Sequence, residues 1–448
     1  MHGGSGTLVP QVIFGLDPLW VSTAVLATTY ALIISEKVNR SIVALLGAGL
    51  MIVVGILDQA EAVRGIDFNT IGLLTGMMIL VSISRRSGMF QYVAVWAAKK
   101  AHASPWGILL LLQLVTAVLS ALLDNVTTVL LIVPVTLAVT RELRVPAYPF
   151  LFAEIFASNI GGTATLIGDP PNILIGSLVG LDFNAFIYHL APVAAVVLTM
   201  QVAMIHLMWG RSLAAAPADR AHVMAMREID TIEDWTLLKQ SLGVLALTIL
   251  GFVSARFIHM EPASIALGGA AMLMLLDNWR HHGERAATNI HKTFSDVEWI
   301  TIFFFLGLFV VVHGVEVGGL LGLLGRELVT LTGGDLALTG YAILWASAVL
   351  SAIIDNIPFV ATMIPLVKTM APAFGGSEHI EPLWWCLSLG ACLGGNGTLI
   401  GASANLTVAG IGERNGVPFR FVTFSLYAFP MMLGSIAIAH LYVWLRYF

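Results

Sequence analysis

Two apolar stretches of this chain each carry an aspartate followed by an asparagine. The first reads LSALLDNVTTVLLIVP and contains Asp124 and Asn125; the second reads LSAIIDNIPFVATMIP and contains Asp355 and Asn356. An aspartate deep in hydrocarbon costs about 2.5–3.5 kcal/mol or more. A carboxyl group that is neutral when unpaired and charged when hydrated is a good proton carrier. These pairs are therefore candidates for binding protons or cations, unless each aspartate only caps the helix that follows it.

The composition predicts a membrane protein. Of the 448 residues, 58% are hydrophobic and 11% charged, whereas a soluble domain has about 25% charged residues. Apolar runs long enough to cross a bilayer recur along the whole chain. The formal net charge of −5 suggests no nucleic-acid partner. No nucleotide-binding motif is present, and we predict no cofactor, no bound metal and no enzymatic activity.

The order of apolar runs predicts an all-α polytopic protein with about ten transmembrane helices, two re-entrant hairpins and two broken helices. The hairpins are expected at 105–140 and 337–371, each with an Asp-Asn pair near its middle. The broken helices are expected at 148–181 and 384–410, interrupted by GGTATLIGDPPN and GGNGTLIGASAN. Amphipathic helices are expected at 89–104 and 316–333. Simple spans are expected near 18–35, 41–57, 69–87, 185–209, 239–257, 261–277, 298–314 and 418–446.

An internal duplication explains this order. Residues 119–139 match 350–370 at an offset of 231, with seven of 21 positions identical. Residues 161–172 match 394–405 at an offset of 233, with seven of 12 identical. We therefore expect a first repeat over 1–210, a cytoplasmic linker over 211–236 and a second repeat over 237–448.

Positive charge predicts the orientation of the chain. If both hairpins re-enter, 17 of the 22 Lys and Arg residues lie on one face of the membrane and five on the other. Both termini then lie outside, and the two repeats are inverted. The rival topology needs two helices of about 20 residues in each hairpin stretch, whereas each arm has only about 16 apolar residues.

Inverted repeats with discontinuous helices are typical of secondary transporters, which hold substrate and coupling ion near the bilayer midplane. Broken helix ends survive in hydrocarbon only where they line a polar cavity. The polar residues of the hairpin tips and breaks are therefore the candidate site. The candidate coupling residues are Asp124, Asp169, Asp355 and Glu154, and the candidate substrate-binding residues are Asn125, Thr127, Thr128, Asn159, Gly162, Thr163, Thr165, Asn172, Asn356, Asn396, Thr398 and Asn405.

The two halves differ in chemistry at the breaks. Glu154 and Asp169 align with Leu387 and Ala402, so cation or proton handling is expected to favour the first half. For Glu154, the alternative is an ion pair with a loop arginine near the membrane face. Cys392 either contacts a thiophilic metalloid or, as is more common for such a residue, packs as a small side chain.

The blocks LLDNVTTVLLIVP and SNIGGTATLIGDPPNILIG, with their second copies, resemble the ion transporter superfamily. This group includes arsenite efflux permeases (ArsB), NhaD-type sodium/proton antiporters and the pink-eyed dilution (P) protein, and GDPPN is similar to the P-protein branch. The resemblance covers nearly the whole chain. It implies a scaffold, a moving region with two hairpins and two broken helices, elevator-like alternating access and a homodimer. Sodium-coupled dicarboxylate relatives carry Ser-Asn-Thr at the tips, so Asp-Asn here favours protons.

The leading functional hypothesis is a proton-coupled transporter that exports arsenite or antimonite across the inner membrane, with an ATPase subunit as a compatible partner. A sodium/proton antiporter or a small-anion transporter would use the same layout. An intramembrane aspartyl protease using Asp124 and Asp355 is disfavoured, because the chain has no Gly-x-Gly-Asp motif. A passive channel is a further alternative.

Overall fold

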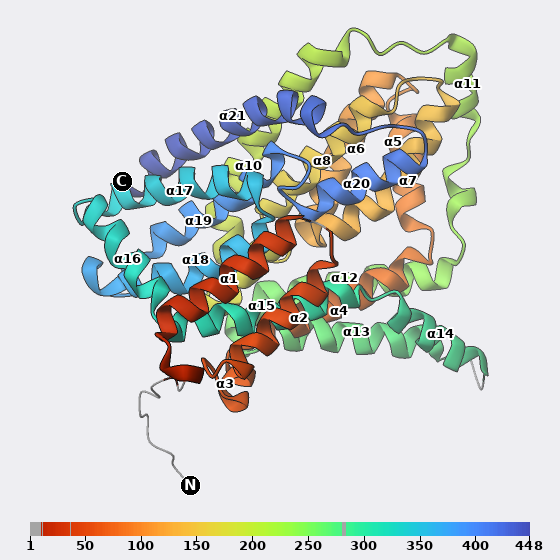
Figure 1. The fold of residues 1–448 in the computed structure, drawn as a ribbon. Coiled ribbons are helices and arrows are strands. Elements are labelled where there is room, and N and C mark those ends of the chain that lie inside the picture. The colour runs from red at the N-terminus through yellow and green to blue at the C-terminus, as the bar shows by residue number, and fades with distance from the viewer. Residues whose placement is uncertain (1–9, 11, 36, 280–283) are drawn as a thin grey trace. The chain divides into compact units, whose positions relative to one another are not determined.

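The computed structural model describes residues 10, 12–35, 37–279 and 284–448, and every regular element among them is helical (Figure 1). Ten of these helices are long and apolar enough to cross a membrane. The predicted all-helical polytopic fold is therefore confirmed, while residues 1–9 and their placement lie outside the described part. By contacts, the chain divides into two compact units.

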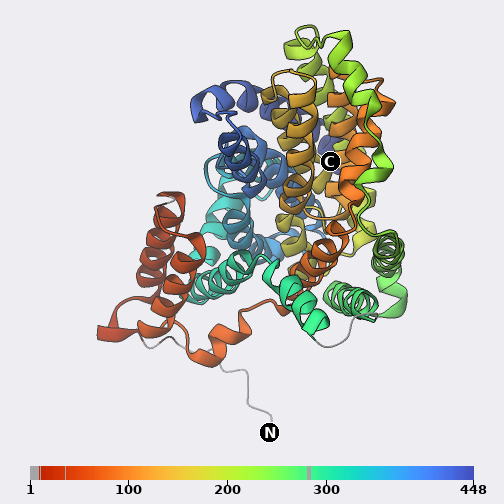
Figure 2. The ribbon, with the colours of Figure 1, turned by 90° about the vertical axis from the view of Figure 1, so that its right-hand side faces the viewer.

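Unit 1 comprises Met1–Ile71, Glu298–Thr339 and Ala361–Ile380. Small residues bring its main helices together: a Cβ on Gly307 would lie 2.5 Å from the carbonyl carbon of Ala44. Such close backbone approach is typical of helix packing in membranes. Figures 1 and 2 show α1 and α2 side by side. The elements are the short η1 (Ile13–Gly15), α1 (Pro18–Ser35), α2 (Arg40–Val53), α3 (Gln59–Arg64), α15 (Trp299–Gly318), α16 (Leu320–Leu331) and the short η4 (Ala371–Phe374).

Unit 2 comprises Gly72–Val297, Gly340–Val360 and Glu381–Phe448, and it contains every candidate site residue. Three helices cross the unit boundaries: α4 (Phe68–Arg85), α17 (Leu336–Ile353) and α18 (Asn356–Met370). The others are α5 (Met89–Lys100), α6 (Pro105–Leu122), α7 (Asn125–Glu142), α8 (Tyr148–Thr163), α9 (Pro170–Val179), α10 (Phe183–Ile205) with the π-helical η2 (His206–Gly210), α11 (Pro217–Ala225), η3 (Glu228–Thr231), α12 (Trp235–Ile258), α13 (Pro262–Asn278), α14 (Glu284–Ser295), α19 (Glu381–Gly394), η5 (Gly395–Gly397), α20 (Ser403–Arg414) and α21 (Phe421–Tyr447).

The predicted hairpins are two helix pairs that turn at the Asp-Asn positions. Helices α6 and α7 meet at Leu123 and Asp124, and α17 and α18 meet just before Asn356. Three of the four arms have 18 residues, which is about the length a span needs. The expectation of short arms is therefore wrong, and re-entry of the hairpins stays a prediction.

The same close packing recurs beside each hairpin. A Cβ on Gly161 of α8 would lie 2.2 Å from the Ala117 carbonyl oxygen of α6, and one on Gly394 of α19 would lie 2.6 Å from the Ala348 Cα of α17. Only a residue without a side chain allows these approaches. Glycine therefore sets the contact between hairpin and broken helix in both halves.

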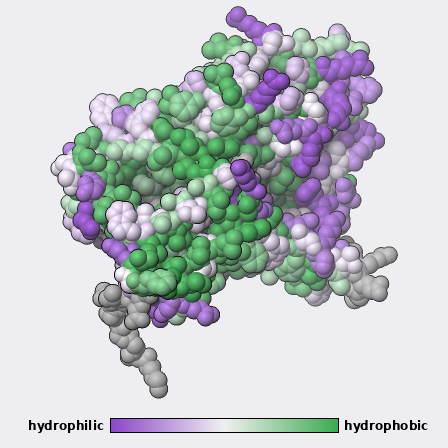
Figure 3. Space-filling model, in the orientation of Figure 1, coloured by the Kyte–Doolittle hydropathy of each residue, from purple (hydrophilic) through white to green (hydrophobic). Residues whose placement is uncertain are grey.

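The hydrophilic stretch after α10 is more ordered than a linker. It contains α11 and η3 and is held to α5 by an ion pair of 2.5 Å between Lys99 Nζ and Glu228 Oε2. The backbone N–H of Glu233 also donates to the Ser87 carbonyl at 3.0 Å. Figure 3 shows hydrophilic residues gathered along the segment of α11. Helix α14 had not been expected from the hydropathy pattern.

Candidate functional site

The first hairpin tip is built by a helix cap. Leu123 and Asp124 are extended, with φ of −120° and −108°, and end the helical path of α6. The Asp124 carboxylate accepts the Thr127 backbone N–H at 2.8 Å and the Thr127 hydroxyl, which satisfies the start of α7. The cap interpretation of Asp124 is thus part of the structure, and it leaves Asn125 at the first position of the helix.

The second tip uses a different partner. The Asp355 carboxylate accepts the Ile357 backbone N–H at 3.0 Å and the hydroxyl of Ser403 at 2.9 Å. Ser403 is the first residue of α20, so this contact joins the second tip to the second break. The first tip meets its own break through the backbone, where the Asn125 N–H donates to the Gly168 carbonyl at 3.0 Å.

The carboxylate of Asp169 lies where the two tips meet. Asn125 Nδ2 donates to Asp169 Oδ1 at 3.2 Å, and Asn356 Nδ2 lies 3.4 and 3.5 Å from its two carboxylate oxygens. The Asp169 side chain is fully buried. One carboxylate from the first break therefore receives the asparagines of both hairpins, which are 231 residues apart in sequence.

A chain of amide groups continues from this carboxylate. Asn125 Nδ2 also lies 3.1 Å from Asn159 Oδ1, and Asn159 Nδ2 donates to Asn396 Oδ1 at 3.0 Å and to Asn405 Oδ1 at 2.8 Å. All four amides are buried. We call these four asparagines, together with Asp124, Asp169, Asp355 and Asn356, the polar centre.

Asn172 and Asn405 lock the two breaks by equivalent bonds. The Asn172 amide donates to the carbonyls of Gly162 at 3.4 Å and Thr165 at 2.9 Å, and the Asn405 amide donates to the corresponding carbonyls of Gly395 at 2.7 Å and Thr398 at 2.8 Å. Asn172 also donates to the Thr163 carbonyl at 3.1 Å. These carbonyls have lost their helical partners, so the asparagines satisfy groups that hydrocarbon cannot. Both asparagines hold the breaks open.

Four of the predicted substrate-binding threonines use their hydroxyls on partners within the chain itself. Thr127 bonds Asp124, Thr165 donates to the Ala121 carbonyl, and Thr398 donates to the Ala352 carbonyl. Thr163 similarly donates to the Asn159 carbonyl at 2.7 Å. Gly162 is required for packing, because a Cβ there would lie 2.4 Å from the Gly168 carbonyl oxygen.

Several buried atoms of the polar centre and its edge have no hydrogen-bond partner. Among the described residues these include Asn125 Oδ1, Asn396 Nδ2 and the Thr128 hydroxyl. Buried polar groups nearly always have a partner, so unpartnered ones indicate bound water, ion or substrate. Within the described residues, Asp124 and Asp169 form no ion pair, and no group of three acidic, histidine or cysteine side chains is arranged to hold a metal ion.

Glu154 lies outside the polar centre. Its side chain is 1% exposed on α8, and the Thr136 hydroxyl donates to Oε1. Within the described residues it forms no ion pair, so the alternative of pairing with a loop arginine is wrong. Five residues separate it from Asn159, which is about 7.5 Å along the helix.

Sequence reasoning missed Ser388 on the second broken helix, whereas it named Cys392 as either a metalloid contact or a packing residue. Ser388 Oγ donates to Asn172 Oδ1 at 2.6 Å, and the Cys392 thiol lies 3.5 Å from the same oxygen. The two residues are four apart and share one face of α19. That spacing could have identified Ser388, although its partner lies 216 residues away. Cys392 is buried against an asparagine, as a packing residue would be.

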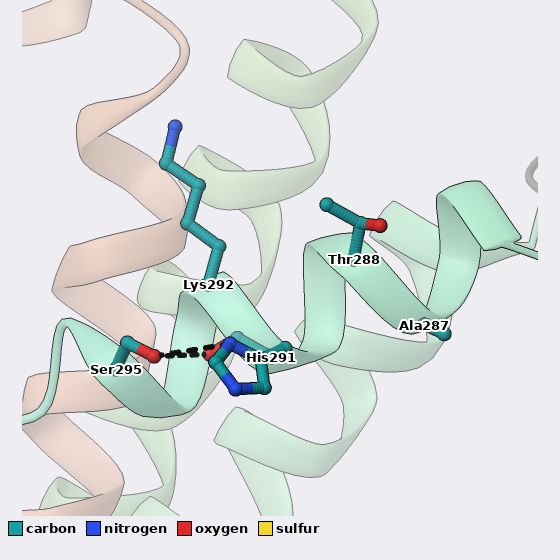
Figure 4. Close-up of a pocket in the computed structure, with 5 residues that line it drawn as sticks. All are labelled: Ala287, Thr288, His291, Lys292 and Ser295. Carbon is teal, nitrogen blue, oxygen red and sulfur yellow. Dashed lines mark hydrogen bonds between the residues drawn. The ribbon is translucent and has the colours of Figure 1, made fainter.

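An open hollow elsewhere in unit 2 contains none of the candidate site residues. It has a volume of about 690 Å³ and lies along α14, as Figure 4 shows. The Ser295 hydroxyl there donates to the His291 carbonyl of its own helix at 2.8 Å. Its lining residues are Ala287, Thr288, His291, Lys292 and Ser295.

Comparison with known proteins identifies the family. The family model described as "citrate transporter" (CitMHS) matches residues 30–390, most of the chain. The chain belongs to this family. It is 44% identical over 433 residues to a Mycobacterium tuberculosis protein named only as an uncharacterized transporter, covering 96% of this chain and 98% of that protein. The human P protein is 35% identical over 94% of this chain, which spans 59% of the P protein.

Two solved transporters support the fold of this CitMHS member. The YdaH transporter of Alcanivorax borkumensis superposes with a TM-score of 0.58 at 14% identity, over 96% of this chain and 98% of that one. MtrF of Neisseria gonorrhoeae, whose structure is described as illuminating antimetabolite efflux pumps, superposes with a TM-score of 0.57 at 12% identity, over 97% and 96%. These two structures support the fold alone, whereas the family match and the M. tuberculosis relative make the CitMHS chain a membrane transporter. The suspected kinship with the P protein is confirmed by the 35% identity.

Proposed function

We propose that this protein is a proton-coupled secondary transporter of a small anion that works by alternating access around the polar centre. The observation that carries the proposal is the fully buried Asp169 carboxylate, which receives Asn125 and Asn356 and, within the described part of the chain, no cationic side chain. A buried carboxylate without a cation is held most easily as an acid or with a bound cation. Asp169, Asp124 and Asp355 are the proposed coupling residues.

The helix starts around the centre favour an anion. Helices α7, α9, α18 and α20 all begin at residues of the polar centre or directly beside them. The first backbone N–H groups of a helix and its dipole attract negative charge. Carboxylates stand just before three of these starts, whereas Ala402 precedes α20 and provides no side-chain cap. The first backbone N–H groups of α20 are therefore the proposed place for the anion, beside Asp355, whose carboxylate accepts the Ser403 hydroxyl.

Charge repulsion links the anion to protons. Two like charges 4 Å apart repel by about 4 kcal/mol at an effective dielectric constant of about 20. An anion entering beside ionised Asp124, Asp169 and Asp355 would meet this repulsion from each carboxylate that it approached. Protonation removes the repulsion, so anion and protons would bind together and travel in the same direction. Citrate, which the family description names, is the first anion to test.

Export of arsenite or antimonite is less well supported by the site. The chain has two cysteines, and both Cys386 and Cys392 are buried. A soft, thiol-rich metalloid site would need more sulfur ligands than these. A neutral arsenite molecule would have to rely on the asparagine amides alone. Arsenite export, a sodium/proton exchange, a homodimer and an ATPase partner stay predictions from resemblance.

Flux measurements on the purified full-length protein in liposomes test the proposal. Labelled citrate, phosphate, arsenite and antimonite are offered in turn under an inward proton gradient, with internal pH recorded. We expect accumulation of an anion with acidification inside, both lost in Asp169→Asn.

Three other outcomes would each overturn the proposal in a distinct way. Arsenite movement without any anion flux favours the metalloid hypothesis. Sodium–proton exchange without a further solute favours an antiporter. Counterflow that ignores pH and survives Asp124→Asn and Asp355→Asn favours a passive channel.

A further inference from the structure

A second buried polar cluster lies in unit 2 along α8. At its middle is the Glu154 carboxyl group, whose Oε1 accepts the Thr136 hydroxyl and whose buried Oε2 has no partner among the described residues. Because Oε1 is already an acceptor, Oε2 is the atom with room for a proton or a water molecule. A carboxyl group at this depth needs one or the other.

Helix α6 brings further unpartnered atoms to the same place. Gln113 is fully buried and neither its amide oxygen nor its amide nitrogen has a partner in the described part of the chain; the Thr116 hydroxyl is buried and unpartnered as well. The register of the helices follows from Ala117, which lies against Gly161. One turn earlier, Gln113 therefore lies level with Ala157 of α8, which is three residues after Glu154 on the same face of that helix.

Several unpartnered donors and acceptors in one buried region indicate bound water. Buried waters in proteins make about three hydrogen bonds each, to polar groups that have no other partner. The cluster has carboxyl, amide and hydroxyl groups, so it offers a water molecule both donors and acceptors. Water would also link it toward the polar centre, since the unpartnered Thr128 hydroxyl and Asn125 Oδ1 follow on α7.

No charged group among the described residues competes for Glu154. Helix α6 carries no charged residue, and none of the titratable groups on the other helices packed against α8 bonds or pairs with Glu154. Together with Tyr148 of α8 itself, those groups are Arg141 and Glu142 on α7, Tyr188 and His189 on α10, His206 on η2, Glu381, Cys386 and Cys392 on α19, Glu413 and Arg414 on α20, and Tyr427, His440, Tyr442, Arg446 and Tyr447 on α21.

The duplicated half of the chain repeats only one hydroxyl of this cluster, because Ser347, buried and without a partner among the described residues, corresponds to Thr116. The positions that correspond to Glu154, Thr136 and Gln113 are Leu387, Val367 and Leu344. The fold is therefore built once without these polar groups, so packing of the repeat does not explain them.

We propose that Glu154, with Thr136 and Gln113 and the water they bind, is a second proton-binding site that serves transport from within unit 2. A proton adds to Glu154 Oε2 and leaves again as a proton to water, with no other bond made or broken. The site lies about 9 Å along α8 from its first residue, Tyr148, and about 7.5 Å from Asn159. It thus stands between one end of the helix and the polar centre. This role rests on the proton coupling proposed above.

Infrared difference spectroscopy of the full-length protein between acid and alkaline pH tests the site without any substrate. We expect a carboxylic-acid carbonyl band that disappears in Glu154→Gln, persists in Asp169→Asn and shifts in Thr136→Val. Thr140→Val is the matched control, because this buried hydroxyl one turn further on bonds only the Leu137 carbonyl of its own helix. A difference spectrum of Glu154→Gln identical to that of the wild type overturns the proposal.

Transport measured beside the spectra separates the two proposals. We expect Glu154→Gln to lose the response of uptake to the proton gradient. If gradient-driven uptake is unchanged in Glu154→Gln, the inferred role in transport is wrong. If wild-type uptake ignores the gradient while the Glu154 band is present, the proposed function fails and the proton-binding site stands. If Glu154→Gln does not fold, the expected shift of the carboxylic-acid band in Thr136→Val tests the site in its place.

Discussion

Each half of the duplicated chain places three side chains against backbone carbonyls at equivalent positions. A serine of the hairpin reaches the broken helix, a threonine of the break reaches the hairpin, and an asparagine spans the break. These are Ser120, Thr165 and Asn172 in the first half and Ser351, Thr398 and Asn405 in the second. Their recurrence supports the proposed duplication and indicates that these contacts build the frame.

The two halves share these backbone contacts but differ in which of them carries acidic side chains. Asp169 and Glu154 of the first half correspond to Ala402 and Leu387 of the second. Both hairpins nevertheless send their asparagine to Asp169. A contact kept in both halves is therefore assigned to structure, and a polar group present in only one half is assigned to function. The predictions below test this division.

The largest expected effect comes from removing the carboxylate at position 169 and placing one at the corresponding position, 402. Asp169→Asn keeps the shape of the side chain and removes its charge, so we expect uptake in liposomes to fall to the level of empty liposomes. Adding Ala402→Asp to this variant is expected not to restore uptake, because Asn125 donates to residue 169 and not to residue 402. Restored uptake would show that either half can supply the carboxylate, and the division would be wrong.

A smaller loss of stability, similar in the two halves, is expected when a methyl group is added at the glycine contacts between hairpin and broken helix. In Gly161→Ala the new Cβ would lie 2.2 Å from the Ala117 carbonyl oxygen, and in Gly394→Ala 2.6 Å from the Ala348 Cα. Overpacking of this kind lowers the free energy of unfolding by about 1–3 kcal/mol. Thermal unfolding in detergent should show similar losses for both variants.

Gly410 of α20 provides the matched control for this pair. It has nothing within 4 Å of a Cβ, so Gly410→Ala should leave stability unchanged or raise it by about 0.5–1 kcal/mol. A large loss in Gly161→Ala with none in Gly394→Ala would contradict the equivalence of the two frames.

The sequence was sufficient for features that depend on local pattern. Hydropathy placed α1 at residues 18–35, and the Asp-Asn pairs and glycine-rich breaks fell where the helices turn or stop. These features follow from backbone needs within a few residues. Helix α14 escaped because it is amphipathic and short, so its average hydropathy does not distinguish it from a linker.

The hydrogen-bond partners within and around the polar centre could not be predicted from local sequence patterns. Nothing in the local sequence shows that Asn356 reaches Asp169, 187 residues earlier, or that Thr165 uses its hydroxyl on the Ala121 carbonyl. Such choices depend on how helices distant in sequence pack. The duplication identified which residues correspond, but the partner of each residue required the folded chain.

The smallest effect is expected from a contact that only the first half has, the ion pair of Lys99 on α5 with Glu228. The hydrogen bond from Lys99 lowers the pKa of the half-buried Glu228 carboxyl group from its usual value. A lowered folded-state pKa adds stability above the unfolded-state value of about 4.3, and that stability is lost as the pH falls through the folded-state value. We expect the wild type to unfold at a slightly higher temperature than Lys99→Met at neutral pH, with the difference vanishing in acid and shrinking in high salt. A difference that persists below the folded-state pKa would show that the lysine stem, and not its charge, holds the segment to α5.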